Sequence, residues 1–193
     1  MGITLNKGQT ISLSKESPGL KRVFMGLGWD PAKKGGFFGK IMGGGDDIDL
    51  DASVIVLDQD KTEIDIVSFG KLRSSDGAIK HDGDNLTGEG DGDDEVIHVD
   101  LEKLDARAAY LVFTVNSFRG QTFNEVENAV ARLVDESGNT EVCRYTLKEQ
   151  GRHTGVIMAV LSKGNDGWSM QAHGTPAQGR TVRDIAGQAK SIL

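Results

Sequence analysis

The chain has 193 residues, 22 of them basic and 29 acidic, with a formal net charge of −7 and one cysteine. This length suits a single domain that buries its core without disulfides or metal staples. The lone Cys143 excludes an internal disulfide, and no apolar run approaches the roughly 20 residues of a membrane-spanning helix, so we expect a protein of the reducing cytoplasm.

Short runs of β-branched and apolar residues recur along the whole chain. Turn signals such as Asp76-Gly77 and Asn165-Asp166-Gly167 separate several of them. Many short strands with little helix between them are typical of an all-β, two-sheet β-sandwich. The runs predict strands at residues 10–13, 22–28, 52–57, 64–69, 96–99, 110–115, 129–135, 141–147, 156–162 and 168–172.

Two short helices complete the expected elements. Thr122 and Glu125 have the spacing of a capping box, which predicts a helix over residues 122–128. The tail has apolar residues at helical spacing after Thr181, with Asp184 three residues further on. We therefore expect a domain over residues 1–178, followed by a tail, residues 179–193, that forms either a short amphipathic helix or a frayed end.

Residues 31–45 interrupt this pattern with the sequence PAKKGGFFGKIMGGG. Glycines bracket a small apolar group that includes Phe37 and Phe38 and is flanked by lysines. One interpretation is an insertion loop that folds over its own sandwich. The other is that residues 32–45 contact a protein partner or an anionic membrane surface.

Acidic residues concentrate in two segments. Residues 82–95 read DGDNLTGEGDGDDE, and Asp46, Asp47, Asp49 and Asp51 precede an apolar run. Without these eleven acidic residues, the 22 basic residues would exceed the remaining 18 acidic ones by four. Carboxylates crowded on a glycine-rich backbone repel one another unless a cation lies among them. Hard oxygen ligands on a flexible loop favour Ca²⁺, whereas the alternative is a solvated acidic loop.

Known metal motifs fit these segments poorly. An EF-hand alignment from Asp47 places Ala52 where the invariant turn glycine belongs. Zinc is disfavoured, because the chain has one cysteine and its four histidines lack ligand spacing, which indicates surface or satisfied core positions for them. The most favourable geometry is a loop site at one end of the sandwich, shared between distant segments. No nucleophile elbow or P-loop supports catalysis.

Four stretches together resemble the TerD-like proteins of tellurium resistance and general stress response. They are GITLNKGQTISLSKESPGLKRVFMGLGWD, DIDLDAS, GDNLTGEGDGDDE and SFRGQTFNEVENAVARLVD. The resemblance spans about residues 1–170. The glycine-rich insertion before DIDLDAS looks most like the TerZ branch. The resemblance implies a β-sandwich that binds two calcium ions and a non-catalytic role in bacterial resistance to tellurite and other stresses.

The resemblance also implies ligands and partners. The metal positions carried over are Asp30, Asp49, Asp51, Asp84, Asn85, Asp93, Asp94 and Glu95. The implied partners are other TerD-like proteins and a TerC-type membrane protein, which would place the chain in the cytoplasm or at the inner membrane, with no nucleic-acid partner. Two alternatives remain open: a C2-like module that binds membranes through calcium, and a metal-dependent hydrolase.

Overall fold

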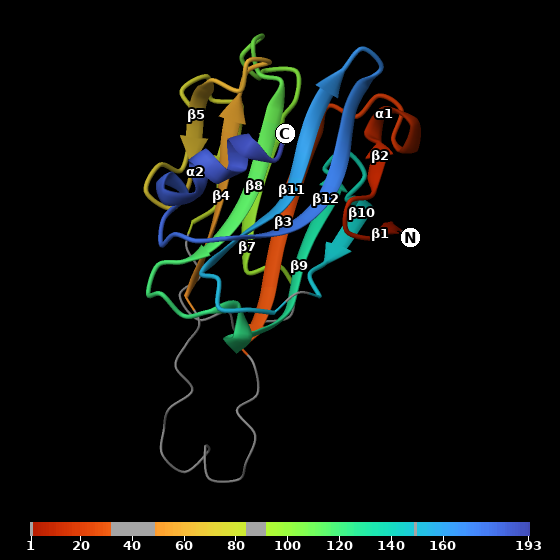
Figure 1. The fold of residues 1–193 in the computed structure, drawn as a ribbon. Coiled ribbons are helices and arrows are strands. Elements are labelled where there is room, and N and C mark those ends of the chain that lie inside the picture. The colour runs from red at the N-terminus through yellow and green to blue at the C-terminus, as the bar shows by residue number, and fades with distance from the viewer. Residues whose placement is uncertain (1, 32–48, 84–91, 149) are drawn as a thin grey trace.

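The computed structural model describes residues 2–31, 49–83, 92–148 and 150–193 (Figure 1). The insertion residues 32–45 and the acidic residues Asp46, Asp47, Asp84 and Asn85 lie outside these ranges, so the expectations for them are untested. Among the described residues, no helix is long and apolar enough to cross a lipid bilayer.

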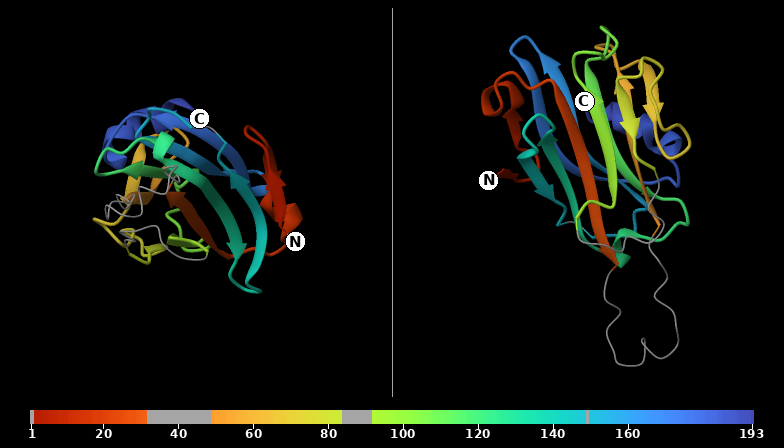
Figure 2. Two further views of the ribbon diagram at one scale, coloured as in Figure 1. Left: turned by 90° about the horizontal axis from the view of Figure 1, so that it is seen from below. Right: turned by 180° about the vertical axis from the view of Figure 1, so that it is seen from behind.

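Two six-stranded sheets pack face to face (Figures 1 and 2), which confirms the predicted β-sandwich. Sheet A has the order β1 (Ile3–Leu5), β10 (Thr140–Thr146), β9 (Val126–Asp135), β3 (Arg22–Pro31), β7 (Glu95–Asp100) and β6 (Ile79–His81). Sheet B has the order β2 (Thr10–Ser12), β12 (Gly167–Ala177), β11 (Gly155–Gly164), β8 (Tyr110–Ser117), β4 (Leu50–Leu57) and β5 (Glu63–Val67).

The core lies between the sheets because alternate residues of each strand point inward. In β3, the inward residues are Val23, Met25, Leu27 and Trp29, and all are buried. The strands β4 and β8 are buried on both faces, since the tail packs on the outer face of sheet B. The helix α2 (Val182–Ser191) covers the cluster of Ile55, Leu57, Val112, Ile157 and Val160 there (Figure 1).

All ten predicted strands are present, with boundaries shifted by a few residues. The structure adds β1 and β6, which are three residues long, and a one-turn helix α1 (Leu13–Glu16), which begins at the residue where the predicted strand at 10–13 was expected to end. The predicted helix at residues 122–128 is mostly wrong. Its capping box forms, but the helix is only a 3-10 turn, η1 (Phe123–Glu125), because Val126 already begins β9 and pairs with β3.

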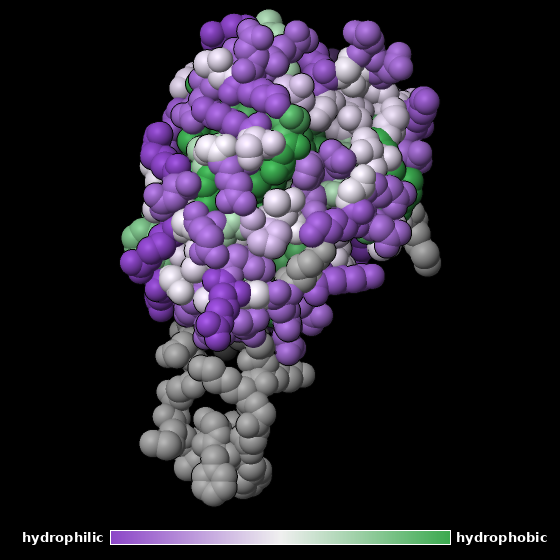
Figure 3. All heavy atoms as spheres, in the orientation of Figure 1, coloured by the Kyte–Doolittle hydropathy of each residue, from purple (hydrophilic) through white to green (hydrophobic). Residues whose placement is uncertain are grey.

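The tail helix follows the sequence pattern closely. Thr181 is its N-cap and accepts a hydrogen bond from the backbone N–H of Asp184, whose carboxylate accepts one from the Thr181 N–H in return. Val182, Ile185, Ala186 and Ala189 are its buried residues. Around this helix the surface shows hydrophobic residues, whereas most of the same face is hydrophilic (Figure 3).

Candidate metal centre

The described residues of the acidic segments lie at one end of the sandwich, where β3 ends and where β4 and β7 begin (Figure 1). Leu27 lies opposite Glu95 in the pairing of β3 with β7, so Asp30 comes three residues beyond the last paired position. The structure therefore brings Asp30, Asp49, Asp51, Asp94 and Glu95 to the same end. It gives each of them a different neighbourhood.

Glu95 bridges the two sheets from inside. The edge strand β5 pairs with β4 only from Val54 onward, so the backbone of Ala52 lacks a strand partner on that side. Glu95 Oε2 accepts the Ala52 N–H at 2.7 Å, and His81 Nε2 lies 3.1 Å from the Ala52 carbonyl oxygen and 3.2 Å from Glu95 Oε2. His81 Nδ1 accepts the Gly83 N–H at 3.0 Å, so the ring proton belongs on Nε2. His81 is thus a satisfied, buried residue, as expected.

Asp94 lies among other carboxylates. Its Oδ2 accepts the backbone N–H of Trp29 at 2.7 Å, and its own N–H donates to the Leu27 carbonyl at 2.9 Å. Burial raises the pKa of Asp94, and the nearby carboxylates of Asp30, Glu95 and Asp93 raise it further, although the Trp29 N–H opposes them. A raised carboxylate pKa marks a place where another negative charge is unfavourable and a cation is favourable.

Asp93 is turned away from this group. Arg132 on β9 holds its carboxylate with two hydrogen bonds, Nε–Oδ1 at 2.6 Å and Nη2–Oδ2 at 2.7 Å. The pair crosses the outer face of sheet A at Gly26, where a Cβ atom would lie 2.2 Å from Asp93 Oδ2. At Gly28 a Cβ would lie 2.8 Å from the Gly92 carbonyl oxygen. These two glycines leave room for the end of the acidic segment to lie on the sheet.

Asp51 lies in β4 of sheet B, and Asp49 directly precedes that strand. Leu50 and Ala52 face the core, so Asp51 points to the outer face, like Ile55 and Leu57 further along β4. Asp49 Oδ2 lies 3.0 Å from Nε of Arg119, which follows β8. The Asp49 side chain is only 9% exposed, and among the described residues its Oδ1 has no hydrogen-bond partner. A buried carboxylate oxygen of this kind is costly unless a cation compensates it.

Within the described ranges, no group of three or more acidic, histidine or cysteine side chains lies close enough to hold a metal ion. A complete coordination sphere would therefore need oxygens of other kinds or residues outside those ranges, such as Asp84 and Asn85. Asp30 Oδ2 already accepts a hydrogen bond from Asn128 Nδ2 at 2.8 Å. The carboxylate and amide groups that could bind a metal ion here offer oxygen atoms, which suit a hard cation and not a soft one.

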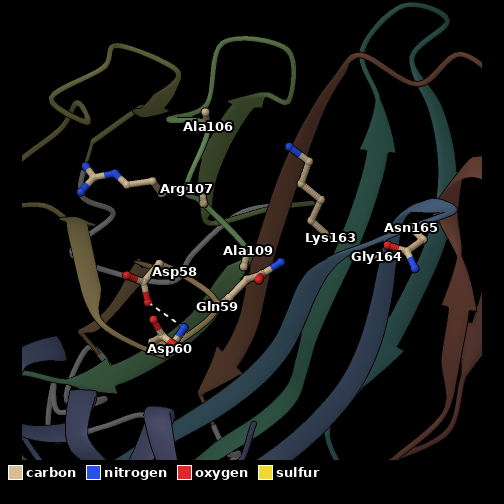
Figure 4. A pocket seen from close by; sticks show the side chains of 10 residues that line it. Asp58, Gln59, Asp60, Ala106, Arg107, Ala109, Lys163, Gly164 and Asn165 are labelled. Atoms are coloured by element: carbon tan, nitrogen blue, oxygen red, sulfur yellow. Dashed lines mark hydrogen bonds between the residues drawn. The ribbon is translucent and has the colours of Figure 1, made fainter.

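A cavity of about 560 Å³ lies at the opposite end, where β4 and β11 end (Figure 4). Two of its charged residues, Asp58 and Arg107, make local contacts. Asp58 Oδ1 accepts the N–H groups of Asp60 and Thr62, at 2.9 and 2.8 Å. Arg107 pairs with Asp105 at 2.8 Å. These groups give no reason to place the functional centre there.

The partners of the acidic residues had no signal in the sequence. Arg119 and Arg132 are ordinary basic residues of a loop and a strand, and Asn116 is an ordinary strand residue. For Arg132 and Asn116, the strand register shows which carboxylate each one faces. Arg132 lies opposite Gly26, which is beneath the Asp93 carboxylate. Asn116 lies opposite Asp51.

Comparisons with known proteins give the same family as the sequence motifs. The TerD domain family matches residues 1–188. The chain is 54% identical to the tellurium resistance protein TerZ of Serratia marcescens, over 95% of this chain and 94% of the relative. It is 42% identical to the stress response protein SCP2 of Bacillus subtilis (strain 168), over 96% of this chain and 98% of that protein. Identity to the TerD protein of Serratia marcescens is 37%, which agrees with the resemblance to the TerZ branch.

A solved structure shares the fold. The homologue of the telluride resistance protein TerD from Streptomyces coelicolor A3(2) superimposes with a TM-score of 0.68 at 23% identity, over 87% of this chain and 96% of that one. At this identity the likeness establishes the sandwich alone. The family match and the identities to curated relatives establish more: this chain belongs to the TerD domain family of tellurium resistance and stress response proteins.

Proposed function

We propose that this chain is a calcium-binding, non-catalytic module of bacterial stress and tellurite resistance that acts in the cytoplasm through protein partners. Family membership supports the biological role, since the relatives carry the names of tellurium resistance and stress response proteins. The observation that supports calcium binding concerns Asp49: its buried Oδ1 has no hydrogen-bond partner among the described residues. A hard divalent cation would supply the missing interaction.

The donor set suits calcium better than other metals. Asp49 and Asp51 would serve one ion on the side of sheet B, and Asp30, Asp94 and Glu95 would serve a second together with Asp84 and Asn85. Magnesium needs only one or two carboxylates and a strict octahedron, whereas calcium accepts six to eight oxygens in irregular geometry. Asp93 anchors the segment through Arg132 in this proposal.

Calorimetric titration of the chelator-treated chain with Ca²⁺ and Mg²⁺ tests this function. We expect calcium binding that magnesium reproduces only weakly, and we expect Asp94→Asn to weaken it strongly. Asp60→Asn is the matched control, because Asp60 lies at the cavity end of the molecule and undergoes the same change. Absence of calcium binding by the native chain would refute the proposal.

The partners proposed by family resemblance are other TerD-like proteins and a TerC-type membrane protein. Co-expression with a tagged TerC-type protein, followed by purification with calcium or with EDTA, tests the second. Recovery of this chain with the tagged protein in calcium supports the proposal. Equal recovery from an untagged control would contradict it.

A C2-like role at membranes is the second candidate, and one surface feature favours it. Phe69 and Phe118 are 42% and 50% exposed, and their ring centroids lie 6.1 Å apart in an edge-on contact. Phe118 precedes Arg119, so an exposed aromatic pair and a cationic side chain lie close to Asp49. Sedimentation with vesicles of anionic lipid, with and without Ca²⁺, separates the candidates, because only the C2-like module sediments in a calcium-dependent way.

A further inference from the structure

Two more buried oxygens lie on the outer face of sheet B. Thr114 and Asn116 on β8 are fully buried, and neither Thr114 Oγ1 nor Asn116 Oδ1 has a hydrogen-bond partner among the described residues. Both side chains share the outer face with Val112, since Leu111, Phe113 and Val115 face the core. A buried acceptor without a donor costs free energy, so two of them beside the acidic segment need an explanation.

The strand register places Asn116 next to an acidic residue. Asn116 lies directly opposite Asp51 in the pairing of β8 with β4, and Thr114 lies opposite Ser53. Side chains of directly opposed residues have Cβ atoms about 4.5–5.5 Å apart. On its other side, Asn116 lies opposite Gly155 of β11, which has no side chain to cover it. Asn116, Asp51 and the preceding Asp49 thus form one short stretch of oxygen-bearing side chains.

The orientation of the Asn116 amide is fixed by its own hydrogen bond. Nδ2 donates to the Arg180 carbonyl oxygen at 2.8 Å, in the segment before α2. A carbonyl accepts and cannot donate, so the nitrogen belongs on that side and Oδ1 on the other. An asparagine that merely neutralised Asp51 would turn Nδ2 toward the carboxylate. In Asn116, Nδ2 instead donates to the Arg180 carbonyl, so the acceptor Oδ1 stays on the side of the Asp51 carboxylate.

An amide oxygen and a carboxylate placed side by side repel each other unless a cation lies between them. Asn and Asp side-chain oxygens are both regular calcium ligands, and a neutral amide adds coordination without further repulsion. Asp51 points outward, whereas Glu95 approaches Ala52 from β7 of the other sheet. The two groups of oxygens therefore lie on different sides of β4.

We propose that Asn116 supplies its amide oxygen to a calcium ion shared with Asp49 and Asp51, in a site on the outer face of sheet B that is distinct from the carboxylates of Asp30, Asp94 and Glu95. The proposal rests on the calcium-binding function proposed above. It adds a ligand that lies outside both acidic segments and that no cluster of acidic residues would reveal.

Calorimetric titration with Ca²⁺ of the native chain and three variants tests it. Asn116→Ala should weaken one calcium site by about tenfold or more, since even residues that only support a metal ligand change affinity by that factor. Asn116→Asp restores an oxygen and should bind better than Asn116→Ala. Thr154→Val is the matched control. Thr154 Oγ1 likewise donates a hydrogen bond to the segment before α2, since it lies 2.9 Å from the Gly179 carbonyl oxygen. Thr154 directly precedes β11.

Thermal unfolding gives the second readout. In EDTA, Asn116→Ala and Thr154→Val should lose similar stability, whereas added calcium should stabilise the alanine variant less. A native chain that binds no calcium would refute both the proposed function and this site. A native chain that binds calcium, with Asn116→Ala titrating like Thr154→Val or with Asn116→Asp no better than Asn116→Ala, would overturn this site alone.

Discussion

Two carboxylates, Asp93 beside the outer face of sheet A and Asp49 just before β4 of sheet B, are compensated in different ways. On sheet A several carboxylates have a cationic partner nearby, although Asp30 pairs with the neutral Asn128. Arg132 holds Asp93 with two hydrogen bonds, Arg144 holds Glu141, and His98 lies between Asp82 and Glu136. Arg132 also stacks over Phe24, which ties this network to the strand beneath it. These basic side chains compensate the negative charge of the carboxylates that they hold.

At Asp49 the balance is incomplete, whereas Asp65 and Glu63 of sheet B have basic partners. Arg119 reaches one oxygen of Asp49 and is itself 53% exposed, while the second oxygen is buried without a hydrogen-bond partner among the described residues. Asn116 adds a further acceptor and no compensating charge. Arg132 therefore compensates both oxygens of Asp93, whereas Arg119 compensates only one oxygen of Asp49.

The largest expected effect concerns calcium itself. If sheet B and the Asp94 group need a cation, calcium at 100 times its dissociation constant should stabilise the fold by about 2.7 kcal/mol. For a chain of this size that is a rise of about 5–10 °C in Tm. Thermal unfolding in Ca²⁺, Mg²⁺ and EDTA measures it. A Tm that does not change when EDTA is added would mean that neither Asp49 nor Asp94 needs a calcium ion.

Next in size is a pair of matched substitutions. Asp93→Asn should destabilise the chain by about 1–3 kcal/mol with or without calcium, because it breaks a two-hydrogen-bond pair with a largely buried carboxylate. Asp49→Asn should weaken calcium binding yet leave the EDTA-treated chain equally or slightly more stable, since it removes a poorly compensated charge. Denaturant unfolding and calorimetry on both variants measure this. If Asp93→Asn and Asp49→Asn changed stability and calcium binding in the same way, the two carboxylates would have the same role.

A smaller effect is expected at Arg119. Its cation competes with calcium for Asp49, so Arg119→Gln should tighten calcium binding by about two- to fivefold, the range that corresponds to an exposed ion pair of up to about 1 kcal/mol. Arg107→Gln at the far end makes the same change in net charge and serves as the control. Equal affinities in the two variants would show that Arg119 does not compete.

The smallest effect is a pH dependence confined to sheet A. Burial lowers the pKa of His98, but its hydrogen bonds with Glu136 and Asp82 outweigh this and raise it above the ordinary value of about 6.5. Because the folded pKa is the higher one, the stabilisation is fully present below about pH 6.5 and is lost as the pH rises through the raised value. In EDTA, the Tm difference between the native chain and His98→Gln should shrink from pH 6 to pH 9. A difference that grows with pH would contradict the assignment.

The sequence alone determined the class of fold and the end of the molecule that carries the acidic residues. Alternating apolar residues in β3 and in β9 dictate strands, because a two-residue period can bury only one face. The Thr181–Asp184 capping box dictated where α2 begins. The helix over residues 122–128 failed for a long-range reason: Val126 pairs with Pro31 of β3, and a capping box only specifies a first turn.

Tertiary structure decided which carboxylates are held and which are not. Asp93, Asp94 and Glu95 are consecutive and chemically alike in the sequence, yet they turn to Arg132, to the Trp29 N–H and to the Ala52 N–H. Their partners come from three different strands. Asn116 meets Asp51 only through the register of β8 on β4. Local sequence sets side-chain type and strand period, but the neighbour across a sheet is set by pairing between distant segments, and that pairing determines whether an oxygen finds a donor, an arginine or room for a cation.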